Sequence, residues 1–184
     1  MQDGGNPWTR RTTREVYENP WLRIREDEVI RPDGADGIYG VVEFKNIATG
    51  IVAVDEQGRV PLVGQWRYPL GRYSWEIPEG GAPAGEDPLA AAKRELQEET
   101  GVIAGRWELL HESDLSNCVT DERAVLFLAR DLTVGRSTPD GDEQLRVRWV
   151  RLDEAVEMAL DGRIRDAVSQ LGLLTAARRL ESRR

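Results

Sequence analysis

One short segment constrains the fold of this chain more than any other: a helix with strong end signals that carries three clustered glutamates. Asp87 is a preferred N-cap residue, and Pro88 suits the first helical position. Gly101 suits a left-handed C-terminal cap. These signals predict a helix over residues 88–100. Its apolar face is formed by Leu89, Ala92 and Leu96.

The glutamates of this helix are Glu95, Glu98 and Glu99, at spacings that place their side chains next to one another. The ordinary interpretation of such a cluster is a solvated acidic face. Here, however, a Gly-rich loop over residues 79–85 leads directly into the helix and can bring backbone carbonyls near the carboxylates. Clustered oxygen ligands are what a hard divalent cation needs, and Mg²⁺ often shares its shell with substrate phosphates. The segment therefore predicts a metal site that acts on a diphosphate.

Composition narrows the chemistry further. The chain has 33 acidic and 25 basic residues, a formal charge of −8, which argues against binding to nucleic acid or to an anionic membrane. A single histidine, His111, and a single cysteine, Cys118, exclude an internal disulfide and zinc sites built from several such ligands. Any metal site must then be mostly oxygen-ligated. With no long apolar run and no signal-like segment, we expect a cytoplasmic protein.

The order of strand and helix signals predicts an α+β fold, a mixed sheet flanked by helices. Residues 1–46 are expected to hold a frayed tail over 1–12 and then a small antiparallel β unit, and residues 47–184 form the main domain. Residues 51–54 and 60–65 are expected to form a hairpin, and residues 79–88 a Gly- and Pro-rich turn. Further strands are predicted over 107–111, 123–129 and 145–151, and helices over 153–160 and 166–180.

The glutamate helix and its loop also carry a family pattern. The matching positions are Gly80, Glu86, Arg94, Glu95, Leu96, Glu98, Glu99, Gly101 and Val102. Their spacing matches the Nudix box at every specified position, so the chain resembles the Nudix hydrolase superfamily. The resemblance implies an α/β/α sandwich over about residues 47–184. It also implies hydrolysis of a nucleoside diphosphate linked to another moiety, with Mg²⁺ or Mn²⁺ as cofactor.

The same resemblance implies roles for individual residues. Glu95 and Glu99 correspond to the principal metal ligands, and Glu98 to a third ligand or a base. The backbone carbonyl of Glu79, just before the box glycine, is expected to contribute a further ligand. Arg94 resembles the arginine that orients the glutamates, with Glu86 as its ion-pair partner.

Segments outside the box resemble the branch of the family that hydrolyses ADP-ribose and related nucleotide sugars. They are residues 65–69, residues 75–78, the N-terminal β unit and residues 162–164. In that branch the N-terminal unit joins a second subunit, so a homodimer is expected. Residues 116–122 depart from the branch pattern, because Asn117 stands where a proline is common. This departure leaves open GDP-mannose, other ADP-sugars or a broad range of nucleoside diphosphate sugars.

The catalytic base in that branch tends to sit in an acidic loop just before a strand. Here Glu143 occupies that position, with Asp142 and Glu98 as alternatives. The chemistry requires a flexible carboxylate that can reach the attacking water.

Five residues are predicted to bind the substrate. Trp21 and Tyr39 resemble the aromatic residues that stack on the base, and the alternative is that they are core or dimer contacts. Arg67 is expected to bind phosphate or ribose, and Glu76 the base or the terminal sugar. Trp66 is a weaker candidate. All five lie upstream of the box.

The leading hypothesis is a metal-dependent pyrophosphohydrolase that releases a nucleoside monophosphate and a sugar phosphate. A non-catalytic sensor of nucleotide sugars is the alternative from another class, and the intact box argues against it. A hydrolase of nucleic-acid ends is a third, and the charge of −8 argues against that.

Overall fold

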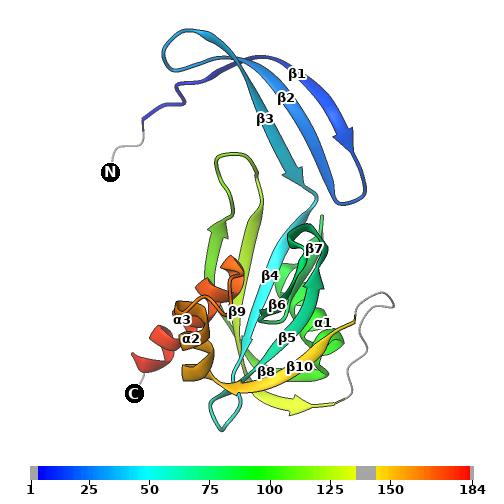
Figure 1. The fold of residues 1–184 in the computed structure, drawn as a ribbon, viewed down its shortest axis with the longest axis vertical. Helices are drawn as coiled ribbons and strands as arrows, with labels where there is room; N and C mark the ends of the chain where they lie inside the picture. The colour runs from blue at the N-terminus through cyan, green and yellow to red at the C-terminus, as the bar shows by residue number, and fades with distance from the viewer. Residues whose placement is uncertain (1–3, 136–143, 183–184) are drawn as a thin grey trace. The chain divides into compact units, whose positions relative to one another are not determined.

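The computed structural model describes residues 4–135 and 144–182. These residues fall into two compact units (Figure 1). The first lies within Met1–Asn46 and Asp114–Arg123, and the second within Ile47–Ser113 and Ala124–Arg184. No helix of the described residues is long and apolar enough to cross a lipid bilayer.

The N-terminal unit is a three-stranded antiparallel sheet in the order β1-β2-β3. Its strands are β1 (Thr9–Glu18), β2 (Leu22–Ile30) and β3 (Asp36–Phe44). The turn between β2 and β3 is closed by a hydrogen bond from the Gly34 N–H to the Arg31 carbonyl, and Gly34 takes the positive φ such a turn needs. The predicted antiparallel unit is confirmed. The expected fraying of residues 9–12 is wrong, because Thr9 and Arg10 pair with the far end of β2 and Thr12 pairs with Glu28.

A distant segment completes this first unit. Residues 114–123, between β8 (Val102–Asp114) and β9 (Arg123–Val134), lie along β3. The Val42 N–H donates to the Val119 carbonyl at 2.9 Å, and the Phe44 N–H donates to the Asp121 carboxylate at 2.8 Å. Local sequence patterns do not reveal this pairing, because its two sides are far apart in the chain.

The second unit contains two sheets. One has the order β7-β4-β9-β8, with β4 (Asn46–Ala53) parallel to β9 and with β7 (Glu79–Pro83) at one edge. The other has the order β10-β5-β6, formed by β10 (Arg146–Arg151), β5 (Arg59–Arg67) and β6 (Arg72–Glu76). The predicted hairpin of residues 51–54 with 60–65 is therefore wrong, since β4 and β5 lie in different sheets. The turn expected over 79–88 is wrong in its first half, which forms β7.

Two helices cover opposite faces of the mixed sheet. Leu96 of α1 (Pro88–Thr100) lies in one buried cluster with Ile51 and Phe127. On the other face, Gly50 of β4 lies so close to Val168 of α3 (Ala167–Glu181) that a Cβ there would meet it at 2.7 Å. Adjacent residues of a strand point to opposite faces, so β4 is buried from both sides. With α2 (Leu152–Leu160) beside α3 (Figure 1), this arrangement confirms the predicted mixed sheet flanked by helices.

The predicted ends of α1 are confirmed. The Asp87 side chain accepts a hydrogen bond from the Leu89 N–H, and Gly101 adopts a left-handed conformation with φ of 71°. The caps satisfy backbone groups that a helix end would otherwise leave unpaired. The caps set the first and last residues of α1, which begins shortly after β7 ends at Pro83. They therefore also determine where the glutamates of α1 lie.

Candidate active site

Three chain segments bring the candidate site together at the ends of β5, β6 and the start of β7. Arg67 is the last residue of β5, Glu76 the last of β6 and Glu79 the first of β7. In the β5–β6 register Glu76 lies opposite Val63, so Glu76 and Arg67 project from the same face. The Ile51 N–H donates to the Pro78 carbonyl, which attaches the connection between β6 and β7 to β4.

Arg67 is held by two carboxylates. Its Nε donates to both oxygens of Glu76 at 3.1 and 3.0 Å, and its Nη2 donates to Glu76 Oε2 at 2.6 Å. The same Nη2 donates to Glu79 Oε1 at 2.5 Å. Burial disfavours the cation, but the hydrogen bonds and negative charges of Glu76 and Glu79 outweigh it and raise the Arg67 pKa above its ordinary value. The arginine is therefore a permanent charge in a fixed orientation.

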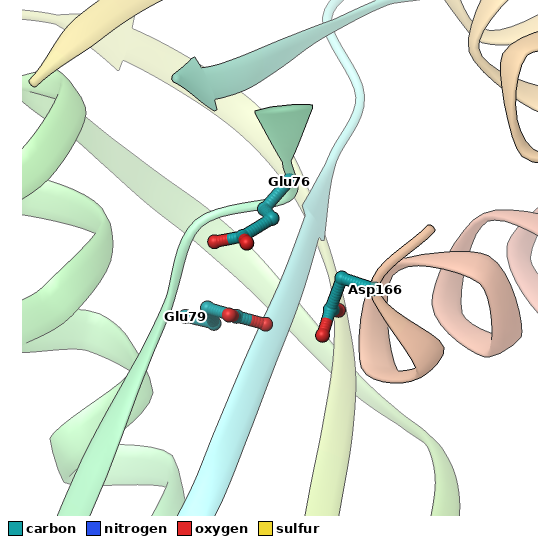
Figure 2. Close-up of side chains that lie close together, drawn as sticks. All are labelled: Glu76, Glu79 and Asp166. Carbon is teal, nitrogen blue, oxygen red and sulfur yellow. The ribbon is translucent and has the colours of Figure 1, made fainter. Parts of the chain in front are cut away.

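A third carboxylate, Asp166, reaches the same place from the start of α3. It is the N-cap of that helix and accepts a hydrogen bond from the Ser169 N–H at 2.6 Å. The Ser169 hydroxyl in turn accepts from the Ile77 N–H at 3.0 Å, which attaches α3 to the residue after β6. Figure 2 shows the side chains of Glu76, Glu79 and Asp166 turned toward one another, each with a carboxylate oxygen within 4.8 Å of the others.

This acidic group has a clear electrostatic consequence. Burial raises the pKa of the Glu79 carboxyl well above its ordinary value, and the negative charges of Asp166 and Glu76 raise it further. Arg67 acts in the opposite direction but does not compensate. Three carboxylates thus share one guanidinium, and the group carries excess negative charge.

The glutamates of α1 are organised by Arg94. Its Nη1 donates to Glu95 Oε1 at 2.7 Å and to Glu98 Oε2 at 3.0 Å. Its Nη2 donates to the Gly81 carbonyl at 3.2 Å and to Glu86 Oε2 at 3.3 Å. Burial lowers the Arg94 pKa, but these glutamates reverse that effect and raise it. Glu86, Glu95 and Glu98 are thus the carboxylate partners of Arg94.

The strand β7 lies directly against the glutamate helix. A Cβ built on Gly80 would lie 2.0 Å from the carboxyl carbon of Glu95, so only glycine leaves room for that side chain. The Gly80 carbonyl accepts a hydrogen bond from the Thr49 hydroxyl, and the Glu79 N–H donates to Glu99 Oε2 at 3.1 Å. Backbone contacts from β7 therefore place two of the predicted metal ligands.

The carboxylates of α1 are of the kind that a hard divalent cation binds, whereas the acidic group whose oxygens all lie within 4.8 Å of one another in the described residues is Glu76, Glu79 and Asp166. Glu95, Glu98 and Glu99 offer oxygen ligands from neighbouring turns of one helix, and the missing Cβ of Gly80 leaves room for the Glu95 carboxylate. Oxygen-only ligation suits Mg²⁺ or Mn²⁺. The role of the Glu79 carbonyl as a further ligand remains a prediction.

The structure distributes the other predicted residues more widely. Trp66 precedes Arg67 on β5, projects from the opposite face and is 61% exposed. In the N-terminal unit Trp21 is 67% exposed. The Tyr39 hydroxyl donates to the Cys118 carbonyl at 2.6 Å, and its ring meets Trp8 edge-on at 5.2 Å between centroids.

Two predicted residues lie outside the part of the chain that the structure describes, and two functional carboxylates were not predicted. Glu143 and Asp142 lie outside the described residues. Asp166 was expected only to begin a helix, although the same N-cap signal could have drawn attention to it as a fixed carboxylate. The side chain of Glu79 was not predicted either, because the family pattern points only to its backbone carbonyl.

Comparison with known proteins places this site in a family. Residues 44–171 match the NUDIX domain, and residues 8–42 match the nucleoside diphosphate sugar hydrolase N-terminal domain. The chain therefore belongs to the NUDIX family and is a hydrolase of that family.

Individual relatives agree with this assignment. The chain is 36% identical over 154 residues to an ADP-ribose pyrophosphatase of Mycobacterium tuberculosis, covering 82% of this chain and 74% of that protein. It is 30% identical over 155 residues to an ADP-ribose pyrophosphatase of Bacillus subtilis, covering 83% of each. A crystal structure described as an ADP compounds hydrolase has the same fold, with a TM-score of 0.87 and 18% identity over 99% of this chain and 98% of that one.

Proposed function

We propose that this protein is a Mg²⁺-dependent pyrophosphohydrolase that cleaves ADP-ribose or a related nucleoside diphosphate sugar. The products are a nucleoside monophosphate and a sugar phosphate. The observation that carries the proposal is the arrangement of the α1 glutamates. Glu95 and Glu98 accept hydrogen bonds from Arg94, and Glu99 accepts one from the backbone N–H of Glu79 in β7. The match of residues 8–42 to the nucleoside diphosphate sugar hydrolase N-terminal domain, and the names of the relatives, support the substrate class.

The glutamates Glu95, Glu98 and Glu99 hold the metal in this proposal. A bound Mg²⁺ supplies neutralisation of the charge on the diphosphate. Arg94 keeps Glu95 and Glu98 in place through its hydrogen bonds. Mn²⁺ is an acceptable substitute, because it prefers similar oxygen ligands.

Residues outside the helix bind the substrate and move the proton. Arg67 donates hydrogen bonds to a phosphate or to the ribose, and Glu143 accepts the proton of the attacking water, with Asp142 and Glu98 as alternatives. Glu76 serves the substrate mainly through Arg67, since both of its carboxylate oxygens already accept from that guanidinium.

The same proposal includes a homodimer formed through the N-terminal unit. The N-terminal unit exposes large apolar side chains, among them Tyr17 of β1, Trp21 between β1 and β2, and Ile38 of β3. Their exposed apolar area supports burial against another chain. Trp21 has the exposure needed to stack on a base, whereas the Tyr39 hydroxyl is committed to the Cys118 carbonyl. Light scattering should give the mass of two chains, and a monomer at micromolar concentration would contradict this part.

A substrate screen tests the proposal. Purified protein with Mg²⁺ is given ADP-ribose, GDP-mannose, ADP-glucose, UDP-glucose, diadenosine polyphosphates and nucleoside triphosphates, and a coupled phosphatase reports the products. We expect the diphosphate sugars to be preferred and Glu99→Gln to be inactive on all of them. Preferential hydrolysis of triphosphates would overturn the substrate class, and binding of ADP-ribose without release of AMP would indicate a sensor.

A further inference from the structure

Arg67 carries one positive charge but is paired with two carboxylates, those of Glu76 and Glu79. Glu76 is 2% exposed and makes three contacts with Nε and Nη2, which is a complete counter-charge for one guanidinium. Glu79 adds a second carboxylate to the same Nη2 at 2.5 Å. This second carboxylate lies beside Glu76 and Asp166 and is repelled by both. Charge balance therefore does not account for Glu79, and its side chain needs another explanation.

The geometry of the hydrogen bonds offers an explanation for the Glu79 side chain. The Nη2 group donates to Glu76 and Glu79 together, while Nε donates to Glu76. Within the described part of the chain, Nη1 makes no hydrogen bond. A guanidinium is planar, so holding Nε and Nη2 also sets the direction of Nη1. Glu79 is connected to α1 as well, because its backbone N–H donates to Glu99.

We propose that Glu79 is a positioning residue for substrate binding. Its side chain fixes Arg67 so that Nη1 is presented to the diphosphate or ribose of the substrate, while its backbone fixes Glu99. The inference rests on the proposed function, because it takes Arg67 as a substrate-binding residue. It assigns the Glu79 side chain a task that is separate from ligation by its carbonyl.

Two substitutions separate orientation from charge. Glu79→Ala removes the acceptor and the charge, whereas Glu79→Gln removes the charge and keeps an oxygen that accepts from Nη2. We expect Glu79→Ala to raise the KM for ADP-ribose about fivefold, the equivalent of one hydrogen bond, with kcat within about twofold. Glu79→Gln should restore KM to within about twofold. Glu154→Ala is the matched control, because it removes the carboxylate partner of the exposed Arg148.

A double substitution tests whether Glu79 acts through Arg67. In an Arg67→Ala background, adding Glu79→Ala should leave KM within about twofold. An equal fivefold rise in both backgrounds would overturn the inference. A fall in KM for both Glu79→Ala and Glu79→Gln would also overturn it, because repulsion of the substrate would then be the main effect of the carboxylate. A loss of kcat alone would place its action on Glu99 instead and refute the role in binding.

Binding without turnover keeps this test separate from the test of the proposed function. The Kd for α,β-methylene ADP-ribose, measured by calorimetry with Mg²⁺, should follow the same pattern as KM across the variants. If the wild-type protein binds this ligand but hydrolyses no diphosphate sugar, the proposed function fails and the Kd values still decide the role of Glu79. If it neither binds the ligand nor hydrolyses a diphosphate sugar, both proposals fail. Thermal unfolding of each variant confirms that it is folded.

Discussion

Substitution of Gly80 by alanine is a direct test of how β7 places the Glu95 side chain of α1. The added Cβ would lie 2.0 Å from the Glu95 carboxyl carbon, 2.3 Å from its Oε1 and 2.5 Å from its Cγ. Ordinary contacts begin at 3.4 Å, so the carboxylate must retreat by about 1.4 Å. Gly80 is not among the residues with positive φ, so alanine can adopt its backbone conformation. The strain therefore falls on Glu95.

The expected cost is in activity more than in stability. A displacement of about 1 Å at a catalytic group can reduce the rate about 100-fold, so kcat/KM for ADP-ribose should fall by about that factor. The displaced group is the end of a flexible side chain, so the free energy of unfolding should change by only about 1 kcal/mol. The Mg²⁺ concentration for half-maximal activity should rise, because a metal ligand has moved.

The assay compares phosphate release by Gly80→Ala and by a control with the same chemical change. Gly40→Ala is suitable, because a Cβ on Gly40 has no heavy atom within 4 Å. The control should keep kcat/KM to within about twofold. If Gly80→Ala retained wild-type activity and wild-type Mg²⁺ dependence, Glu95 could not be a ligand whose position matters, and the reasoning would be refuted.

Three further predictions concern single residues. Glu99→Gln should lower kcat on the order of 1,000-fold, which is more than the loss of a residue that only supports a metal ligand. Its Tm should be nearly unchanged, because the amide oxygen can still accept from the Glu79 N–H. Normal turnover would exclude Glu99 as a ligand. The Glu79 pKa is raised above 4.5 in the folded protein, so its ionisation should reduce stability as pH rises above that value. The Tm of metal-free Glu79→Gln minus that of wild type should accordingly grow from pH 5 to pH 8, and a constant difference would contradict the assigned environment. Leu96→Ala should cost about 2–5 kcal/mol in urea unfolding, because Leu96 is fully buried against β4 and β9.

Local signals in the sequence were sufficient to predict α1 and the contacts of its glutamates with Arg94. Asp87 and Gly101 cap α1 as expected, and the spacing of its glutamates with Arg94 fixed which side chains would meet. These interactions span only a few residues of one helix. A pattern of capping and periodicity therefore carries the information that decides them.

The pairing of strands that lie far apart in the chain could not be predicted from local sequence patterns. The run Ile51–Val54 is apolar at every position, which suits a central strand covered on both faces, but the nearby turn favoured a hairpin with the following strand. The structure instead pairs β4 with β9. Asp166 illustrates the same limit within the site. Its N-cap role is local, whereas its approach to Glu76 depends on how α3 packs on the sheet.

The hydrogen bonds between β3 and residues 114–123 also bear on the order in which the chain can fold during synthesis. The strands β1 to β3 leave the ribosome before the second unit, yet the partners of Val42 and Phe44 in residues 119–121 follow only after all of α1 has been made. A nascent chain must hold this sheet incomplete while residues 47–113, the first part of the second unit, are translated. Removing the N-terminal strands to obtain a minimal hydrolase would strip residues 114–123 of the backbone partners that they use in the finished protein.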